Sequence, residues 1–387
     1  MDLTAASILE IGALLLLAAV AGWGARRVGL PAILGYLAVG LLVSPFTPGY
    51  VADREQLQLL ADLGVVLLLF EVGIEIDLGR IRREERRLLW AAPLQAALTL
   101  AISAGALVLA GLDPLAAATV GLAVALSSSV VIVNMTRSRR RTTDPPTEHA
   151  LLGWSVVQDV VGVAIAAVLL AMLGVSGRPL PETAAGLIAY TAVAVVVAAA
   201  LPRILRLFRG EPDLFLLVSV SAGLVVAGVG SAVFGVPLAL AAFVAGLAIS
   251  EGRETAEARR RLIPFRDLFA VLFFVTIGTL VDPGRLVGPG LGWLALLLAL
   301  VVLAKVVVVW AIARLAGLRA RPAQLAIGLG QMGEFSFVLA AAAATAGAIS
   351  QDLYVAMIAA VAVTVAASTV LVRAAGPSGA RSVAEPA

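Results

Sequence analysis

The sequence predicts an all-α polytopic membrane protein with about 13 transmembrane helices. Hydrophobic residues make up 61% of the chain and charged residues only 14%, the mean hydropathy is +1.04, and apolar runs recur along the whole sequence. A helix needs roughly 20 apolar residues to cross a membrane, so 387 residues leave no room for a sizeable soluble domain. We therefore expect residues 1–387 to form one transmembrane domain that ends in a short cytoplasmic tail, residues 374–387.

Apolar runs, and the Gly, Pro and Arg residues between them, define thirteen candidate spans. They cover residues 5–23, 30–44, 57–76, 88–110, 115–135, 150–173, 183–201, 214–233, 236–250, 268–281, 291–313, 323–348 and 353–372. The second and ninth spans are unusually short for a crossing. Asp2 precedes the first span and Arg26 and Arg27 follow it, which is the reverse of a signal peptide, so this span should remain in the membrane.

Arginine placement predicts the orientation of the chain. Of the 28 basic residues, 24 are arginines in the connections after odd-numbered spans or in the tail, and three are arginines in the connections after even-numbered spans. Cytoplasmic connections carry such an excess, so we expect the N-terminus outside the cytoplasm and the C-terminus inside it. Because no basic domain lies outside the membrane, we expect these arginines to contact lipid headgroups and not nucleic acid.

An internal repeat decides the predicted architecture. Asp62, Gly73, Asp77, Gly79 and Arg80 recur 205 residues later as Asp267, Gly278, Asp282, Gly284 and Arg285, and Pro31, Gly40, Leu41 and Ser44 recur 206 residues later as Pro237, Gly246, Leu247 and Ser250. Equivalent segments lie seven spans apart. Because seven is odd, the two copies cross the membrane in opposite directions, which makes this an inverted-topology repeat. Secondary transporters are commonly built in this way, with the substrate site near the midplane.

Two charged residues lie at membrane depth, where an ionised group is costly and usually functional. Asp159 lies in the middle of the sixth span, directly after Gln158 and four residues after Ser155. Lys305, the only lysine of the chain, lies in the middle of the eleventh span. A buried lysine can release its proton, whereas arginine cannot. We therefore interpret Asp159 and Lys305 as functional residues.

Two spans look interrupted. The fifth contains Ser127, Ser128 and Ser129, and the twelfth contains the run Gly328-Leu329-Gly330-Gln331-Met332-Gly333-Glu334. Gly121 and Ser129 match Gly328 and Ser336 at an offset of 207, so the two spans are repeat partners. Clustered Ser and Gly release backbone groups from the helix, and such groups survive in a membrane only where they line a cavity or pack on protein. We predict opposed half-helices here, with Gln331, Gly333 and Glu334 supporting the second break.

Other kinds of site are excluded by residues that the sequence lacks or misplaces. Cysteine is absent, which excludes disulfides, thiolate nucleophiles and cysteine metal sites. Gly328, Gly330 and Gly333 spell the dinucleotide fingerprint G-x-G-x-x-G, but that motif needs a preceding strand, and this one lies inside an apolar span. The spans contain no Ser/His pair, H-E-x-x-H motif or Asp pair. We expect neither an enzyme nor a cofactor.

Taken together, segments 30–44, 69–75, 125–129, 158–159, 273–278 and 333–336 resemble the cation:proton antiporter-2 family, which includes Kef-type potassium efflux and Nap-type sodium/proton antiporters. The resemblance covers essentially the whole chain. It implies a homodimer in the bacterial inner membrane with two crossed, interrupted helices. Spans 1–3 and 8–10 would form the dimer or scaffold domain, spans 4–6 and 11–13 the core transport domain, and residues 183–207 the linker helix. Asp159 matches the family's essential carboxylate, and Lys305 lies where sodium-exporting members carry a lysine.

The resulting hypothesis is secondary active antiport. Asp159 holds either a proton or a monovalent cation, Na⁺ or K⁺, and Gln158, Ser127, Ser128 and Ser129 surround the ion. Electrogenic members carry two adjacent Asp residues where this chain has Gln158 and Asp159, as Kef-type members do. One titrating carboxylate predicts one proton per cation and electroneutral exchange, unless Lys305 acts as a proton carrier. Kef-type proteins also end in a nucleotide-binding regulatory domain, whereas this sequence stops soon after Val372, so we expect no such domain among these residues.

Two other transport modes remain open. A sodium-coupled organic-solute symporter can share the repeat architecture, and it would show a larger cavity and substrate-dependent sodium uptake. A channel would conduct passively, but an Asp and a Lys at one constriction suit a cycling binding site better. The sequence leaves the choice between Na⁺ and K⁺ open.

Overall fold

The computed structural model describes residues 3–47, 54–75, 86–136, 143–174, 178–208, 210–249 and 253–375, and their regular elements are helices. The helices are α1 Leu3–Arg27, α2 Ala32–Leu42, α3 Arg54–Glu75, α5 Leu88–Leu109, α6 Pro114–Ala125, α7 Ser129–Thr136, α8 Pro145–Met172, α9 Leu180–Leu207, α10 Pro212–Ala232, α11 Leu238–Ile249, α12 Arg253–Thr279, α13 Pro283–Val287, α14 Pro289–Leu300, the π-helical turn η1 Val301–Val306, α15 Val307–Leu315, α16 Pro322–Leu329, α17 Phe335–Thr345 and α18 Gln351–Ala374. The all-α fold class is confirmed. Most of the predicted tail 374–387, and residues 77–80 of the first repeat copy, lie outside the described residues.

Each of the thirteen predicted spans corresponds to one helix or to one pair of half-helices. Within the described residues, nine helices are long and apolar enough to cross a membrane, and three apolar helices are shorter. The two short spans are α2, with 11 residues, and α11, with 12 residues. The two interrupted spans are the pairs α6/α7 and α16/α17.

Two spans differ in detail from their expected bounds or form. The tenth span was expected at 268–281, whereas α12 begins at Arg253. Hydropathy marks only the apolar part of a helix, and here the helix continues into an arginine-rich turn outside that part. The eleventh span, expected at 291–313, is a helical segment in which a π-helical turn lies between α14 and α15. This turn contains Lys305, and π-helical turns occur frequently at functional sites.

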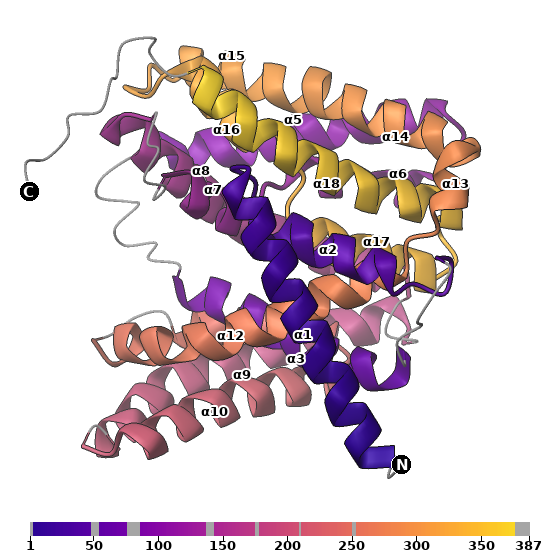
Figure 1. Cartoon of the computed structure of the whole chain (residues 1–387). Helices are drawn as coiled ribbons and strands as arrows, with labels where there is room; N and C mark the ends of the chain where they lie inside the picture. Colours follow the sequence, from indigo (N-terminus) through magenta and orange to yellow (C-terminus); the bar gives the residue numbers. More distant parts are fainter. Residues whose placement is uncertain are drawn as a thin grey trace, which may run out of the picture.

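The helices form two groups (Figure 1). In the view of Figure 1, α5 to α8 and α14 to α18 lie in the upper part, and α3, α9, α10 and α12 lie in the lower part. Within the upper group α6 packs against α5 and α17, and α14 packs against α18. Within the lower group α3 packs against α11 and α12, and α2 packs against α12. Helix α9 contacts α8 of the upper group and α11 of the lower group.

Glycine contacts in the lower group display the repeat directly. A Cβ added to Gly40 on α2 would lie 2.7 Å from the Cα of Gly278 on α12, and one added to Gly246 on α11 would lie 3.0 Å from the Cα of Gly73 on α3. Gly40 and Gly246 are repeat partners, and so are Gly73 and Gly278. The short helix of each copy therefore packs on the long helix of the other copy. Two copies related by a two-fold axis make this reciprocal contact, and the predicted inverted-topology repeat is confirmed.

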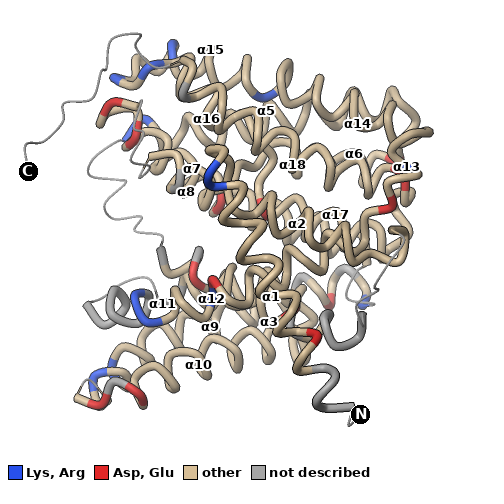
Figure 2. Tube along the Cα trace, viewed as in Figure 1, with Lys and Arg blue, Asp and Glu red and all other residues tan. Residues whose placement is uncertain are grey.

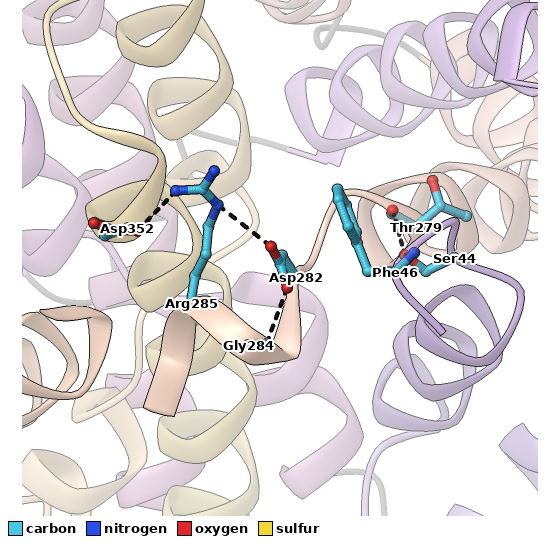
Figure 3. A network of polar contacts seen from close by, with 7 residues as sticks. All are labelled: Ser44, Phe46, Thr279, Asp282, Gly284, Arg285 and Asp352. Carbon is cyan, nitrogen blue, oxygen red and sulfur yellow. Dashed lines mark hydrogen bonds and ion pairs between the residues drawn. The ribbon is translucent and has the colours of Figure 1, made fainter. Parts of the chain in front are cut away.

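A polar network ties down the end of α12, where the chain passes from the lower to the upper group (Figure 3). Ser44 lies just after α2, and its hydroxyl donates a hydrogen bond to the carbonyl oxygen of Thr279, the last residue of α12 (2.9 Å). Beyond α12, the guanidinium of Arg285 contacts the Asp282 carboxylate (3.4 Å) and the Asp352 carboxylate of α18 (3.0 Å). Asp282, Gly284 and Arg285 belong to the second copy of the repeat, and the ion pair of Arg285 with Asp352 links α13 to the upper group.

We expect Gly40→Ala to destabilise the protein, because the added Cβ would lie 2.0 Å from a carbonyl oxygen of α12. Overpacking of this kind costs about 1–3 kcal/mol. Thermal unfolding in detergent should show a lower midpoint for Gly40→Ala. Gly105→Ala on α5 is the matched control, since its Cβ would meet nothing within 4 Å, and its midpoint should be unchanged or higher. Equal midpoints for the two variants would contradict the packing argument.

Candidate functional site

The two interrupted helices cross at their breaks. The Gly333 amide donates a hydrogen bond to the Leu126 carbonyl oxygen (3.0 Å). The Ser127 hydroxyl donates to the Leu329 carbonyl oxygen (2.8 Å), which closes the end of α16. A Cβ on Gly333 would lie 2.6 Å from the carbonyl oxygen of Ser127, so only glycine fits at the crossing. The predicted pair of crossed, interrupted helices is confirmed, and each break supplies partners for backbone groups of the other.

Asp159 lies beside the start of α7. Its side chain is 1% exposed, and the Ser129 hydroxyl donates a hydrogen bond to its Oδ2 atom. Ser129 is the first residue of α7, so the carboxylate lies near the positive end of that half-helix. Ser128, also buried, accepts a hydrogen bond on its hydroxyl oxygen from the Val131 amide (3.3 Å). The arrangement places carboxylate and hydroxyl oxygens together inside the upper group.

Gln158 holds the end of α6. Its Oε1 atom accepts a hydrogen bond from the Ser127 amide (2.8 Å), and its Nε2 group donates to the Ala125 carbonyl oxygen (2.9 Å). The same Nε2 group donates to Oε1 of Gln95 on α5 (2.6 Å), which also accepts from the Trp154 indole (3.2 Å). Gln158 therefore satisfies the hydrogen-bonding groups of the main chain at the break and holds α8 against it.

Gln95 was missed by the sequence analysis. It is fully buried and contacts the break through its Nε2 group, which donates to the Ala125 carbonyl oxygen (3.3 Å). The available signal was a single amide side chain inside the apolar span 88–110. Such a group needs a buried partner in a membrane, but the sequence does not identify that partner as Gln158.

Lys305 joins the two breaks. Its side chain is 0% exposed, and its ammonium donates hydrogen bonds to the Leu126 carbonyl oxygen (2.8 Å) and to the Gln331 carbonyl oxygen. Asp159 lies near enough to attract the same ammonium. The Thr99 hydroxyl donates to the Ala304 carbonyl oxygen (2.7 Å) within the π-helical turn. Lys305 thus places positive charge beside the carbonyl group that follows α6 and beside a carbonyl group in the break after α16.

The structure brings eight of the predicted site residues to the crossing: Ser127, Ser128, Ser129, Gln158, Asp159, Lys305, Gln331 and Gly333. Gln331 contributes its side-chain amide, which donates to the Gly328 carbonyl oxygen (3.3 Å). Glu334 differs from these residues. Neither of its carboxylate oxygens makes a hydrogen bond of ordinary geometry to the described residues, and its side chain lines a cavity.

Two cavities lie between the upper and lower groups. The first, of about 320 Å³, is lined by polar residues Arg26, Tyr36, Arg266, Asp267 and Glu334 together with apolar side chains, and we call it the arginine-side cavity. The second, of about 200 Å³, is mostly apolar and is lined by Asp62, Thr276 and Tyr354 among others.

Three phenylalanine rings separate the two cavities. Phe274 of α12 lines the arginine-side cavity, whereas Phe273 of α12 and Phe337 of α17 line the second one. The ring of Phe337 packs edge-on against Phe274, with centroids 5.8 Å apart, and against Phe273, with centroids 6.3 Å apart. These contacts form an apolar barrier between a helix of the upper group and a helix of the lower group.

We expect Gln95→Leu to destabilise the protein. The substitution removes the acceptor of both the Trp154 indole and the Gln158 amide, and a buried donor left without its partner costs about 1–3 kcal/mol. Ser103→Ala on the same helix is the control, because the buried Ser103 hydroxyl has no hydrogen-bond partner among the described residues. Thermal unfolding should show a clear decrease for Gln95→Leu and none for Ser103→Ala. A loss of similar size in both would mean that the Gln95 contacts contribute nothing specific.

Comparison with known proteins identifies the family. The profile described as "Sodium/hydrogen exchanger, transmembrane" matches residues 14–374. The chain is 32% identical over 340 residues to the protein named "Putative cation/proton antiporter YbaL" of Escherichia coli (strain K12), and the match covers 84% of this chain. The same match covers 61% of YbaL, so this chain spans less than two thirds of the length of that relative.

The fold has counterparts among solved structures. The sodium proton antiporter MjNhaP1 from Methanocaldococcus jannaschii at pH 8 superposes with a TM-score of 0.73 at 18% identity, over 97% of this chain and 97% of that one. An electron-microscopy structure of MjNhaP1 gives a TM-score of 0.66 at 17% identity, over 97% and 96% of the two chains. At this identity the likeness concerns the fold alone. The profile match and the YbaL match together confirm the predicted family: the chain is a multi-pass membrane protein of the sodium/hydrogen exchanger family, a family of cation/proton antiporters.

Proposed function

We propose that this chain exchanges a monovalent cation, Na⁺ or K⁺, for protons through competition at Asp159. The observation that carries the proposal is a buried carboxylate on the unbroken helix α8, beside the start of a half-helix and bonded to the Ser129 hydroxyl. A carboxylate can bind a proton or a cation, but once protonated it has lost the negative charge that attracts the cation. Hydroxyl and main-chain carbonyl oxygens from Ser127 to Ser129 can replace part of the hydration shell of the ion.

The proposed transport motion is that of an elevator. The upper group, α5 to α8 and α14 to α18, carries the site, while α1 to α3 and α10 to α12 serve as scaffold and α9 as linker. Cavities on two sides of the Phe273, Phe274 and Phe337 barrier support this assignment. Ring packing across the boundary is of modest strength and involves no hydrogen-bonding groups, so one helix can slide past the other without leaving polar groups unpaired.

Orientation and assembly complete the proposal. Most of the arginines in Figure 2 lie toward the left edge of the view, and the arginine-rich connections favour that side as the cytoplasmic one. This orientation would place the N-terminus outside and the C-terminus inside the inner membrane of a bacterium. A homodimer formed through the lower group follows from the family resemblance.

The proposed stoichiometry rests on Lys305. Loss of its proton would weaken the contacts with two carbonyl oxygens, those of Leu126 and Gln331, at the crossing of the half-helices. A lysine that is needed for capping should stay charged through the cycle. Asp159 would then be the only group that releases a proton when the cation binds, and the exchange would be electroneutral.

Asp159→Asn should reduce exchange to the level of protein-free liposomes, because an amide cannot trade a proton for a cation. Purified protein is reconstituted, and dissipation of a proton gradient is followed on addition of lithium, sodium, potassium or rubidium. Asp213→Asn, the same chemical change at an exposed position on α10, is the control and should behave as wild type. Exchange by well-folded Asp159→Asn protein would refute the assignment of the site.

Exchange should be insensitive to membrane potential. Moving one net charge would couple about 2.3 kcal/mol per 100 mV into the cycle, which is easily measured, whereas an electroneutral cycle couples none. Sodium-driven exchange is measured with the potential clamped by potassium and valinomycin at several values. A steep and reproducible voltage dependence would show that Lys305 carries a second proton. Its ammonium would then not stay charged and bound to the two carbonyl oxygens throughout the cycle.

A further inference from the structure

We propose that Glu334 is a second cation-binding carboxylate, which a monovalent cation occupies in the arginine-side cavity before it reaches Asp159. The inference rests on the proposed function. Glu334 begins α17, and its side chain is 4% exposed. Its two carboxylate oxygens lack hydrogen bonds of ordinary geometry to the described residues. A carboxylate buried in this way is costly unless a proton, water or a cation satisfies it.

The cavity can supply a hydrated cation. Glu334 lines the arginine-side cavity, whose volume of about 320 Å³ is enough for several water molecules. A cation can therefore reach Glu334 with part of its hydration shell and exchange the remaining waters for carboxylate oxygens. The second cavity, which is mostly apolar, offers no such route.

The charges around Glu334 favour a cation. Arg266 is the nearby positive group on α12, but its guanidinium already binds the Glu71 carboxylate (2.6 Å) and the Asp267 carboxylate (2.6 Å). Two carboxylates therefore compensate one guanidinium before Glu334 is considered. The remaining charged or titratable groups that line the cavity are Arg26 and Tyr36. Glu334 is thus the carboxylate of this cavity that no arginine neutralises directly.

The start of α7 connects Glu334 to Asp159. The Ser128 side chain lies near the Glu334 carboxylate, and the next residue, Ser129, binds Asp159. Val130, one residue further, lines the same cavity. A cation that leaves Glu334 therefore meets two consecutive serine hydroxyls before it meets Asp159. The geometry makes Glu334 an entry site and Asp159 the exchange site.

The first test measures the apparent KM for Na⁺ and for K⁺ in proteoliposomes. Glu334→Gln should raise the KM about tenfold, equivalent to about 1.4 kcal/mol for one lost charged contact, while the maximal rate stays within about twofold. Glu334→Asp keeps the charge and should stay close to wild type. Glu182→Gln, at an exposed carboxylate of α9, is the matched control. An unchanged KM in Glu334→Gln, or a lower maximal rate with an unchanged KM, would overturn the proposal.

The second test does not depend on transport. Because the chain has no cysteine, Val133→Cys introduces a single thiol into the wall of the cavity. In an Asp159→Asn background, Na⁺ or K⁺ should slow modification of this thiol by a cationic methanethiosulfonate reagent, and N-methylglucamine should not. Adding Glu334→Gln should abolish the protection. Absence of protection in the Asp159→Asn background would overturn the role of Glu334 alone, whereas transport by Asp159→Asn would overturn the proposed function instead.

Discussion

The structure depends on satisfying main-chain groups where two helices break inside a membrane. No water competes for these groups in the hydrocarbon region, so protein atoms must supply every partner. The carbonyl oxygens that end α6 and α16 receive donors from four directions: the ammonium of Lys305, the amides of Gln158 and Gln95, and the hydroxyl of Ser127. The site is therefore built around two capped helix breaks, and the lysine among its charged residues is explained by the capping.

The repeat explains why the breaks meet. Reciprocal glycine contacts in the lower group, Gly40 with Gly278 and Gly246 with Gly73, show that each copy packs on the other. The same relation brings the break of the fifth span against the break of the twelfth, where Gly333 contacts Leu126. The two copies have diverged at the crossing. Position 127 is a serine that binds the opposite break, whereas its repeat partner Glu334 lines a cavity and is the entry site that we propose.

The sequence was sufficient for the architecture and for the charged members of the site. Polar residues inside apolar spans mark Asp159, Lys305 and the two breaks, because few other polar groups are tolerated there. It could not reveal how these residues are joined. The partners of Lys305 are backbone carbonyl groups, which have no sequence signature, and one of them lies 179 residues away. Gln95 and Gln158 are 63 residues apart, and nothing in either span alone pairs them.

The capping also bears on why position 158 is a glutamine. The Gln158 amide donates to the Ala125 carbonyl oxygen and to Gln95, while its carbonyl oxygen accepts from the Ser127 amide. An ionised aspartate here could accept but not donate, and its charge would face two oxygen atoms that now receive hydrogen bonds. A second acid next to Asp159 would thus require a different set of donors around α6. In this chain the backbone contacts of Gln158 leave Asp159 as the one acid at the crossing. Under the proposed mechanism, the number of exchangeable protons would therefore depend on how the break is closed.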